Sequence, residues 1–231
     1  MTPQLSAEQI QGLQKHDTCT ISNAIETFEV RLRNEGFADS SIRCLTQCDK
    51  PLVGYAVTVR IRTANLPKDG HPYVERTDWW DCFKDLPSPR IVVIQDMDEH
   101  PGTGSCMGEV HGAILQALGC EGVITNGAVR DLPGLQHMGM HVFARSLAVS
   151  HCYFHMVDMG RPVIIGGLVI NQGDLLHADM HGVLSVPGEI AKGVASVADV
   201  IVAREQRVLD LCREPGFSPE KLREAVKSVF N

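Results

Sequence analysis

The sequence predicts a mixed α/β fold, in which an antiparallel or barrel-like layer packs beside an α/β unit. Three observations support this prediction. In the middle of the chain a buried strand, a glycine-rich loop, a helix and a second strand follow one another, which is the order of a βαβ unit. After Arg161 come short apolar segments broken by glycines, which are typical of antiparallel layers. Helical patterns flank both regions.

The N-terminal segment is predicted to be helical. Ser6-Ala7-Glu8-Gln9 has the pattern of a capping box, in which the Ser and Gln side chains satisfy backbone amides at a helix start. The apolar residues behind it predict two helical pieces: Ile10, Leu13, Ile21, Ile25 and Phe28. The segment Arg31–Leu45 lacks periodicity and is predicted to be irregular.

Two strands are predicted next. Gly54–Ala64 alternates between small or apolar and polar residues, which indicates a half-buried strand. Asn65–Val74 is rich in Pro, Gly and charge and predicts a loop. Ile91–Ile94 is a β-branched run that predicts a short buried strand, and the glycine-rich Met97–Gly108 follows it.

The remaining elements complete the α/β order. Gly108–Leu118 predicts a helix, Gly122–Thr125 a strand and Pro133–His137 one helical turn. From Arg161 to Pro187 three short strands are predicted. At the C-terminus, Ser218-Pro219-Glu220 starts a final helix. It follows a long amphipathic helix over 189–211, whose apolar face contains Ile190, Val194, Val197, Ile201 and Val208.

Bulk properties restrict the class of protein. With 231 residues, 44% hydrophobic and 21% charged, the chain has the composition of one ordinary globular domain. A net charge of -7 without clustered Lys and Arg disfavours a nucleic-acid partner. No apolar run is long enough for a membrane helix, and the N-terminus lacks a signal peptide, so we expect a cytoplasmic protein with no membrane partner.

The cysteines and paired histidines do not predict a zinc site. The eight cysteines are scattered without a C-x-x-C knuckle, although Cys44 and Cys48 are close, and they are predicted to be buried apolar residues. His151 with His155, and His177 with His181, have H-x-x-x-H spacing but no H-E-x-x-H motif. His177 to His181 also lies in strand-like sequence, so most of these histidines are predicted to be structural or interfacial.

The glycines of Gly102–Gly108 permit more than one interpretation. The segment follows a strand and precedes a helix, as a dinucleotide-binding loop does, but its G-x-G-x-x-x-G spacing is one residue too long. Asn126-Gly127 also stands where an acidic residue for the ribose is expected, so a nicotinamide cofactor is disfavoured. Two alternatives remain: a helix N-terminus that binds a small carboxylate, or glycines that only permit a tight connection.

Arg130-Asp131 is a sharper candidate. The doublet follows a buried strand, in a turn attributed to Gly127, and α/β folds bind ligands at the carboxyl ends of parallel strands. The alternative is a surface ion pair of little energetic value. Considered alone, the doublet does not decide between these two interpretations.

Two blocks together resemble a known family. The first runs from Gly108-Glu109 to Gly127-Ala128-Val129 and ends in Arg130-Asp131. The second begins at Gln172-Gly173-Asp174-Leu175 and continues with Ala178-Asp179, Gly182-Val183 and Val186-Pro187. Both are similar to the RraA-like family, which includes the class II 4-hydroxy-4-methyl-2-oxoglutarate/4-carboxy-4-hydroxy-2-oxoadipate aldolases.

The resemblance implies a fold and an assembly. It implies a layered β/β/α swivelling domain that forms homotrimers or homohexamers with active sites between subunits. We therefore expect 1–231 to be a single RraA-like domain, with its core at about 53–187 and helical extensions at 1–50 and 188–231.

The resemblance also implies a site. Asp131 would be the direct protein ligand of a Mg²⁺ or Mn²⁺ ion, and Arg130 would contact the substrate's oxo group. The substrate carboxylate would be held by the backbone N–H groups of the helix start: Gly108, Glu109, Val110 and His111.

Two acidic residues complete the implied site. Glu109 would help to move protons between the 4-hydroxyl group and the pyruvate enolate. Glu205 is the match to an acidic residue that the neighbouring subunit's C-terminal helix supplies. Three positions depart from the family pattern: Asn126 replaces a frequent Asp, Glu109 is Asp in some aldolases, and His111 replaces an apolar residue.

The function that the resemblance implies is a metal-dependent lyase. It would cleave a 4-hydroxy-2-oxo di- or tricarboxylic acid to pyruvate and a second oxo acid, with oxaloacetate decarboxylation as a side activity. One alternative is an RraA-type protein inhibitor of ribonuclease E. Another is a related metal-dependent enzyme that acts on a different oxo acid or on a sugar acid.

Overall fold

The structure is a computed structural model that describes residues 4–47, 49–68, 74 and 77–230. Its centre is a mixed sheet with the strand order β1-β6-β5-β3-β2-β10-β11, in which β4 also pairs with β5 and β7 with β2. The strands of this sheet are β1 (Arg43–Cys44), β2 (Leu52–Arg62), β3 (Arg90–Asp96), β4 (Ser105–Met107), β5 (Cys120–Val129), β6 (His141–Leu147), β7 (His155–Met159), β10 (Leu175–Asp179) and β11 (Gly182–Val186).

The middle of the sheet is parallel. Strands β2, β3, β5 and β6 pair side by side in parallel, as the predicted βαβ order requires. Strands β1, β7, β10 and β11 add to this centre in antiparallel orientation. The predicted mixture of an α/β unit with an antiparallel layer is therefore confirmed.

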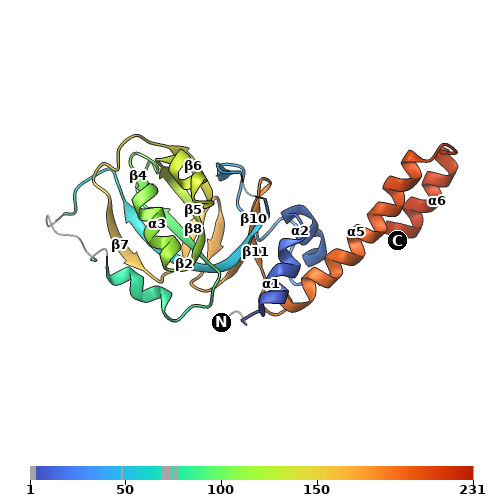
Figure 1. Cartoon of the computed structure of the whole chain (residues 1–231), viewed down its shortest axis with the longest axis horizontal. Helices are drawn as coiled ribbons and strands as arrows, with labels where there is room; N and C mark the ends of the chain where they lie inside the picture. The colour runs from blue at the N-terminus through green and yellow to red at the C-terminus, as the bar shows by residue number, and fades with distance from the viewer. Residues whose placement is uncertain (1–3, 48, 69–73, 75–76, 231) are drawn as a thin grey trace.

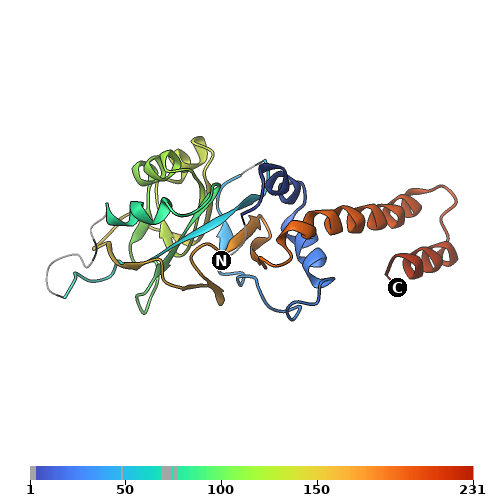
Figure 2. The same cartoon turned by 90° about the horizontal axis from the view of Figure 1, so that it is seen from below.

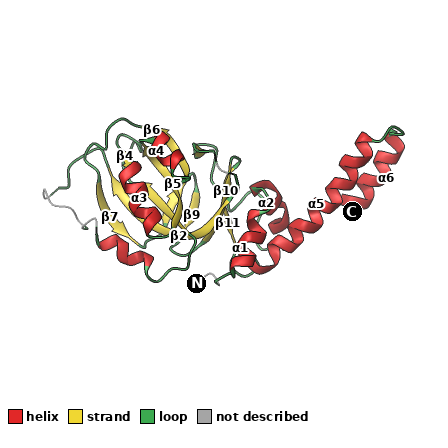
Figure 3. Cartoon of the chain, in the orientation of Figure 1, coloured by secondary structure: helices red, strands yellow, loops and turns green. Residues whose placement is uncertain are grey.

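Layers cover both faces of the sheet (Figures 1, 2 and 3). On one face lie α3 (Glu109–Ala117), α4 (Leu132–His137) and the 3-10 helix η1 (Asp78–Phe83), packed on a large apolar core. On the other face the hairpin of β8 (Val163–Ile165) and β9 (Leu168–Ile170) closes a second core. This arrangement is the predicted layered β/β/α architecture.

Helices from both ends of the chain pack together. α1 (Ala7–Gln14) begins at the predicted capping box of Ser6, and α2 (Thr18–Glu26) follows it. α1 packs on β2 and α2 on β10 and β11, and both contact α5 (Ala191–Arg213) around a third apolar core. The second half of α5, with α6 (Pro219–Phe230), projects from the body as an arm (Figure 1).

The predicted half-buried strand at 54–64 is wrong in its burial. In β2 every residue from Leu52 to Val59 is buried, on both faces of the strand. The reason is its central place in the sheet, between β3 on one side and β10 and β7 on the other, with a layer above and below. Alternation in the sequence indicated the strand, whereas the tertiary position decided its burial.

Other predictions need correction. Four strands, not three, occupy 161–187, and β4, β6 and β7 were not predicted. Gly127 lies within β5 rather than in a turn, and His181 lies in the turn between β10 and β11 rather than in a strand. β4 has only three residues, so its alternation is too brief to identify it. The predicted loop Asn65–Val74 lies partly outside the described residues, and Cys48 lies entirely outside them.

Among the helices that the structure describes, none combines the length and the apolar composition needed to cross a membrane.

Candidate functional site

The two charged doublets of the central βαβ unit meet at one edge of the sheet. Strands β4 and β5 run parallel, and Met107 at the end of β4 is paired with Val129 at the end of β5. The Arg130 N–H donates to the Met107 carbonyl oxygen at 2.8 Å. Because α3 starts directly after β4, its first turn lies beside Arg130 and Asp131.

A pocket of about 220 Å³ opens at this edge. Its lining comes from the ends of β4 and β5, the first turns of α3, η1 and the segment before β7. The lining residues are Trp80, Ser105, Cys106, Met107, Gly108, Val110, His111, Ile114, Arg130, Asp131, His151 and Phe154.

Asp131 has an unusual backbone. Its φ of 54° and ψ of 34° place it in the left-handed region, which costs free energy for any residue except glycine. Its carbonyl oxygen accepts the first N–H groups of α4, from Gly134 and Leu135. Its carboxylate Oδ2 accepts the Glu109 N–H at 3.2 Å and lies 3.4 Å from the Arg130 Nε. The carboxylate is half-exposed at the pocket wall, so it is accessible to a ligand.

Gly108 makes room for this carboxylate. A Cβ atom at Gly108 would lie 2.5 Å from the Asp131 Oδ2 and 3.1 Å from the Arg130 Nε. The backbone of Gly108 is extended, so any residue could adopt it. Glycine is needed here for close approach and not for its conformational freedom.

The residues at the start of α3 that were predicted to hold the substrate carboxylate do not all face the pocket. Val110 and His111 line the pocket. The Glu109 side chain instead lies against Gly134 of α4, and Glu109 is not among the pocket-lining residues. The first intrahelical donor is the Gly112 N–H, which binds the Gly108 carbonyl oxygen. The Glu109 N–H donates to the Asp131 carboxylate and is therefore not available to a substrate carboxylate.

Aromatic neighbours surround His111. Its ring centroid lies 5.5 Å from that of Trp79 and 6.3 Å from that of Phe154. Trp79 is fully buried in the core under α3, so the imidazole packs on a rigid base. The family departure at His111 therefore places an ionisable ring within an aromatic wall.

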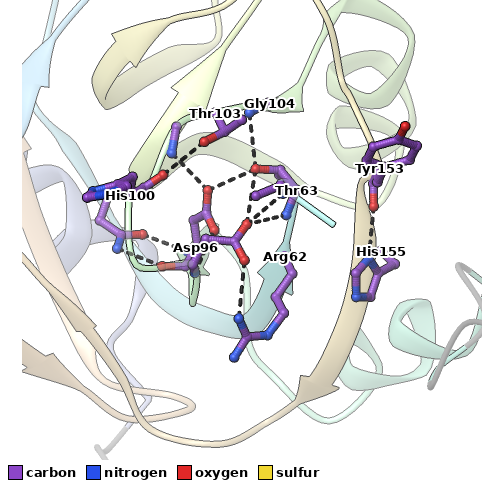
Figure 4. A network of polar contacts seen from close by, with 12 residues as sticks. Arg62, Thr63, Asp96, His100, Thr103, Gly104, Tyr153 and His155 are labelled. Carbon is purple, nitrogen blue, oxygen red and sulfur yellow. Dashed lines mark hydrogen bonds and ion pairs between the residues drawn. The ribbon is translucent and has the colours of Figure 1, made fainter. Parts of the chain in front are cut away.

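A polar network supports the loop that leads into β4 (Figure 4). The Asp98 carboxylate accepts the N–H groups of Thr63 and Ala64 at 2.7 and 2.8 Å. The Thr63 hydroxyl oxygen accepts the Gly104 N–H at 3.0 Å and lies 3.2 Å from an Asp96 oxygen. These hydrogen bonds connect the end of β2 with the residues just before β4, and β4 lines the pocket.

Burial acts differently on the two carboxyls of this network. For Asp96, burial raises the pKa above its usual value. For Asp98, burial alone would raise the pKa, but the hydrogen bonds from Thr63, Ala64 and Arg62 together lower it. The hydrogen bonds to Asp98 thus favour its charged form, whereas burial disfavours the charged form of Asp96.

Asn126, the second departure from the family pattern, has a structural contact. Its side-chain oxygen accepts the Asp96 N–H at 2.7 Å, and its side-chain nitrogen donates to the Asp96 carbonyl at 3.0 Å. The amide thus continues the pairing of β3 with β5 where the backbone register shifts, between Thr125 and Ala128 on the side of β6. It contacts the support of the site and not the pocket.

The donor set suits a hard cation that keeps most of its water. Among the described residues no cluster of three or more His, Cys, Asp or Glu side chains could hold a metal. A structural zinc site needs four such ligands, whereas Mg²⁺ is commonly bound through one or two carboxylates with water and substrate in the other positions. Asp131, half-exposed at the pocket, fits the second case.

The histidines separate into two groups. His177 is buried, and its ring bonds the Thr18 hydroxyl at 2.9 Å and the Leu13 carbonyl at 3.1 Å, so it is structural as predicted. His181 bonds the Asp179 carboxylate. His151, however, lines the pocket, which the sequence did not indicate.

Glu205 lies in the second half of α5, on the projecting arm (Figure 1). It is not among the residues that line the pocket of its own chain. Its predicted role in a neighbouring subunit's site stays a prediction.

Sequence reasoning missed the aromatic part of the lining. Trp80 comes from η1, and Phe154 comes from the segment between β6 and β7. The one available signal was the Trp79-Trp80 pair, because these are the only two tryptophans in a chain with 5% aromatic residues. Nothing local connects that pair with Arg130.

The comparisons with known proteins agree with this architecture. The family model described as RraA-like (Aldolase/RraA) matches residues 18–185. A Photobacterium profundum protein, provisionally named a 4-hydroxy-4-methyl-2-oxoglutarate aldolase, is 28% identical over 116 residues, or 45% of this chain and 69% of that protein. Protein DlpA of Legionella pneumophila is 28% identical over 89 residues, and the match spans 38% of this chain and only 14% of DlpA.

Two solved structures share the fold. An uncharacterized protein from Pseudomonas syringae pv. tomato has a TM-score of 0.74 at 20% identity, covering 97% of this chain and 96% of that one. Streptomyces coelicolor RraAS2, described as an unusual member of the RNase ES inhibitor RraA protein family, has a TM-score of 0.67 at 19% identity, covering 92% and 99%.

Proposed function

Because this chain belongs to the RraA-like family, whose model spans residues 18–185, we propose that it is a divalent-metal-dependent aldolase that releases pyruvate from a 4-hydroxy-2-oxo acid. The observation that carries this proposal is the pocket edge where Asp131, Arg130 and the first turn of α3 meet. Family membership alone leaves the activity open, since the same fold includes protein inhibitors.

Each residue at this edge has a chemical task. Asp131 would hold Mg²⁺ or Mn²⁺, which when bound supplies Lewis-acid polarisation of the substrate's oxo group. The Arg130 guanidinium is permanently charged and can donate hydrogen bonds to the oxygen where negative charge develops. The N–H groups of Val110 and His111 at the start of α3 would orient the substrate carboxylate.

The reaction needs a proton moved twice. A base takes the proton of the 4-hydroxyl group, the C3–C4 bond breaks, and C4 becomes the carbonyl carbon of the second product. The electron pair of the broken C3–C4 bond forms the C2–C3 double bond of the pyruvate enolate, and the negative charge moves to the oxo oxygen. Protonation at C3 then gives pyruvate. Glu109 and the neighbouring subunit's Glu205 are our candidates for these transfers. An assembly of three or six copies would bring the second one to the site.

The first test measures pyruvate release from a panel of 2-oxo acids, including the predicted di- and tricarboxylic substrates and oxaloacetate. We expect Mg²⁺-dependent release that EDTA abolishes. Release of no pyruvate from any of them, with Mg²⁺ or Mn²⁺ present, would refute the aldolase.

The variant Asp131→Asn sharpens this test. Asn tolerates the left-handed backbone but lacks the charge, so we expect loss of activity by at least about a hundredfold with little change in unfolding free energy. Mn²⁺ binding, followed by calorimetry, should be lost in parallel. Glu99→Gln, an exposed carboxylate on the loop after β3, is the matched control and should keep both properties.

The alternative function in this family is inhibition of ribonuclease E by surface contact. Such binding would not need Asp131. A pull-down with ribonuclease E therefore separates the two functions: retention that Asp131→Asn leaves unchanged, without pyruvate release, would favour the inhibitor.

A further inference from the structure

We propose that the substrate carries a single carboxylate and, at its other end, an apolar and preferably aromatic group that packs on the wall formed by Trp80, Val110, Ile114 and Phe154, hereafter the apolar wall. This inference rests on the proposed aldolase function and names its substrate class. It differs from the di- or tricarboxylic substrate that the resemblance implies.

The apolar wall lies inside the pocket and is accessible. Val110 is 76% exposed although it is a large apolar residue. Ile114 stands one helical turn further along α3, so the two side chains share one face of the helix. Both line the pocket, and exposed apolar side chains in a concave site are typical of ligand-binding surfaces.

The aromatic members of the wall are rigidly supported. Trp80 and Phe154 are partly buried, and both pack against the large core between the sheet and α3. They come from η1 and from the segment before β7. Such preformed aromatic surfaces bind flat groups by stacking or edge contacts without first having to order.

The permanently charged residues of the pocket lining are Arg130 and Asp131. Among the lining residues that the structure describes, Arg130 is the one permanently charged cation, and its Nε already lies 3.4 Å from the Asp131 Oδ2. The apolar wall itself supplies no cation. The other ionisable lining residues are His111 and His151, and an imidazole forms an ion pair with a carboxylate only when it is protonated. A second carboxylate placed at the apolar wall would lose its water without a permanent cation to pair with, which disfavours it.

The pocket volume agrees with a small substituent. Cavities of about 150 Å³ in proteins can hold a benzene molecule. The pocket measures about 220 Å³, so it has room for one ring and part of an attached chain. The oxo-acid end would then lie against Arg130 and the start of α3.

The test compares substrates that share one head group. Pyruvate release is measured from 4-hydroxy-2-oxo-4-phenylbutanoate and from 4-hydroxy-4-methyl-2-oxoglutarate, with oxaloacetate as the compound that needs no apolar contact. We expect kcat/KM for the phenyl compound to exceed that for the dicarboxylate by about tenfold or more. The reverse order would overturn the inference while leaving the aldolase function in place.

The variant Phe154→Ala tests the wall directly. It should lower kcat/KM for the phenyl compound about fivefold or more beyond any loss with oxaloacetate. Tyr153→Ala removes the adjacent ring, which is exposed and outside the pocket lining, and should change neither. An equal loss with both compounds in Phe154→Ala would contradict a role in specificity.

Two further measurements keep the inference separate from catalysis. Phenylpyruvate should bind more tightly than 2-oxoglutarate, as measured by calorimetry. This comparison can be made even if the protein cleaves no compound. The absence of cleavage would refute the aldolase function but not the inference about the apolar wall. Light scattering reports the assembly of Phe154→Ala. If that variant loses subunits, the wall is an interface between copies and the inference is wrong.

Discussion

At the scale of single residues, the closest packing in the site is between Gly108 and Asp131. The position of the carboxylate depends on the missing side chain at Gly108, since a Cβ there would come within 2.5 Å of the Asp131 Oδ2. The left-handed backbone of Asp131 fixes the carboxylate from the other side. The fixed position of its carboxylate thus distinguishes Asp131 from an ordinary surface aspartate.

Gly108→Ala should therefore harm activity more than stability. The backbone of Gly108 is extended, so Ala fits it, but the added methyl group must displace the Asp131 carboxylate. We expect at least about a tenfold loss of kcat/KM with a change in unfolding free energy below about 1 kcal/mol. Kinetics and urea unfolding measure the two effects. Wild-type kcat/KM in Gly108→Ala would show that the carboxylate has room to move.

A second residue-scale prediction concerns pH and stability. Burial, together with the charge of Lys50, lowers the pKa of His141 from 6.5 to about 4. The unfolded chain therefore takes up the proton first as the pH falls. The stability that the neutral imidazole provides is complete above pH 6.5 and is lost as the pH falls toward about 4.

His141→Gln removes this titration. Between pH 7.5 and pH 4.5 the wild-type protein should lose about 2–3 kcal/mol of unfolding free energy through His141, and the variant should not. The pKa of the buried His177 is also lowered, so part of the acid sensitivity remains in both proteins. Urea unfolding across this pH range is the measurement, and parallel curves for the two proteins would disprove the assignment.

At the scale of elements, the site depends on the link between the end of β2 and the start of β4. The Thr63 hydroxyl connects the Asp96 and Asp98 carboxylates with the Gly104 N–H (Figure 4). The ladder of β4 supplies few hydrogen bonds of its own, because this strand has only three residues. The side chains of Thr63, Asp96 and Asp98, rather than a long strand ladder, therefore hold the segment that leads into β4.

Thr63→Val tests this link, since it keeps the shape and removes the hydroxyl. It leaves the buried Gly104 N–H without its acceptor, and we expect a loss of about 1–3 kcal/mol in unfolding free energy together with reduced turnover. Thr103→Val is the matched control: its hydroxyl is exposed and donates to the His100 carbonyl, so the change should stay within about 0.5 kcal/mol. Equal stability of the two variants would show that Thr63 is dispensable.

At the scale of the whole molecule, the arm formed by the second half of α5 and by α6 has few contacts with the body of its own chain. The buried residues of α5 are Ala191, Val194 and Ala198, all in its first half. The second half of α5 and α6 extend away from the body (Figure 1). Leu209 on α5 and Phe217 in the connection to α6 are exposed apolar residues. This arrangement is consistent with the predicted assembly, in which a neighbouring subunit receives the arm.

Subunit complementation tests whether Glu205 acts in the neighbouring subunit's site. Asp131→Asn and Glu205→Gln should each be inactive alone. If every site combines Asp131 of one copy with Glu205 of another, mixed assemblies of the two variants should recover roughly a quarter of the wild-type activity. Asp210→Asn, an exposed acid further along the arm, is the control and should stay active. No recovery on mixing would place both residues in the same subunit's site or remove Glu205 from it.

The sequence by itself determined the helices at both ends of the chain, the central βαβ order and the place of Arg130 and Asp131 after a strand. The capping box at Ser6, the βαβ order and the long C-terminal helix depend on contacts between residues a few positions apart, which periodicity records directly. The placement of Arg130 and Asp131 at a strand end followed from the same local pattern. Local patterns also indicated Gly108, and the structure shows that Gly108 approaches Asp131 closely.

Only the tertiary structure decided burial, direction and the shape of the pocket. It buried β2 on both faces, directed Glu109 toward α4 and His111 into the pocket, and brought Trp80 and Phe154 beside the start of α3. The physical reason is that these outcomes depend on contacts between segments far apart in the chain. Trp80 and Phe154 are separated by more than the whole βαβ unit, and no periodicity within either segment reports the other.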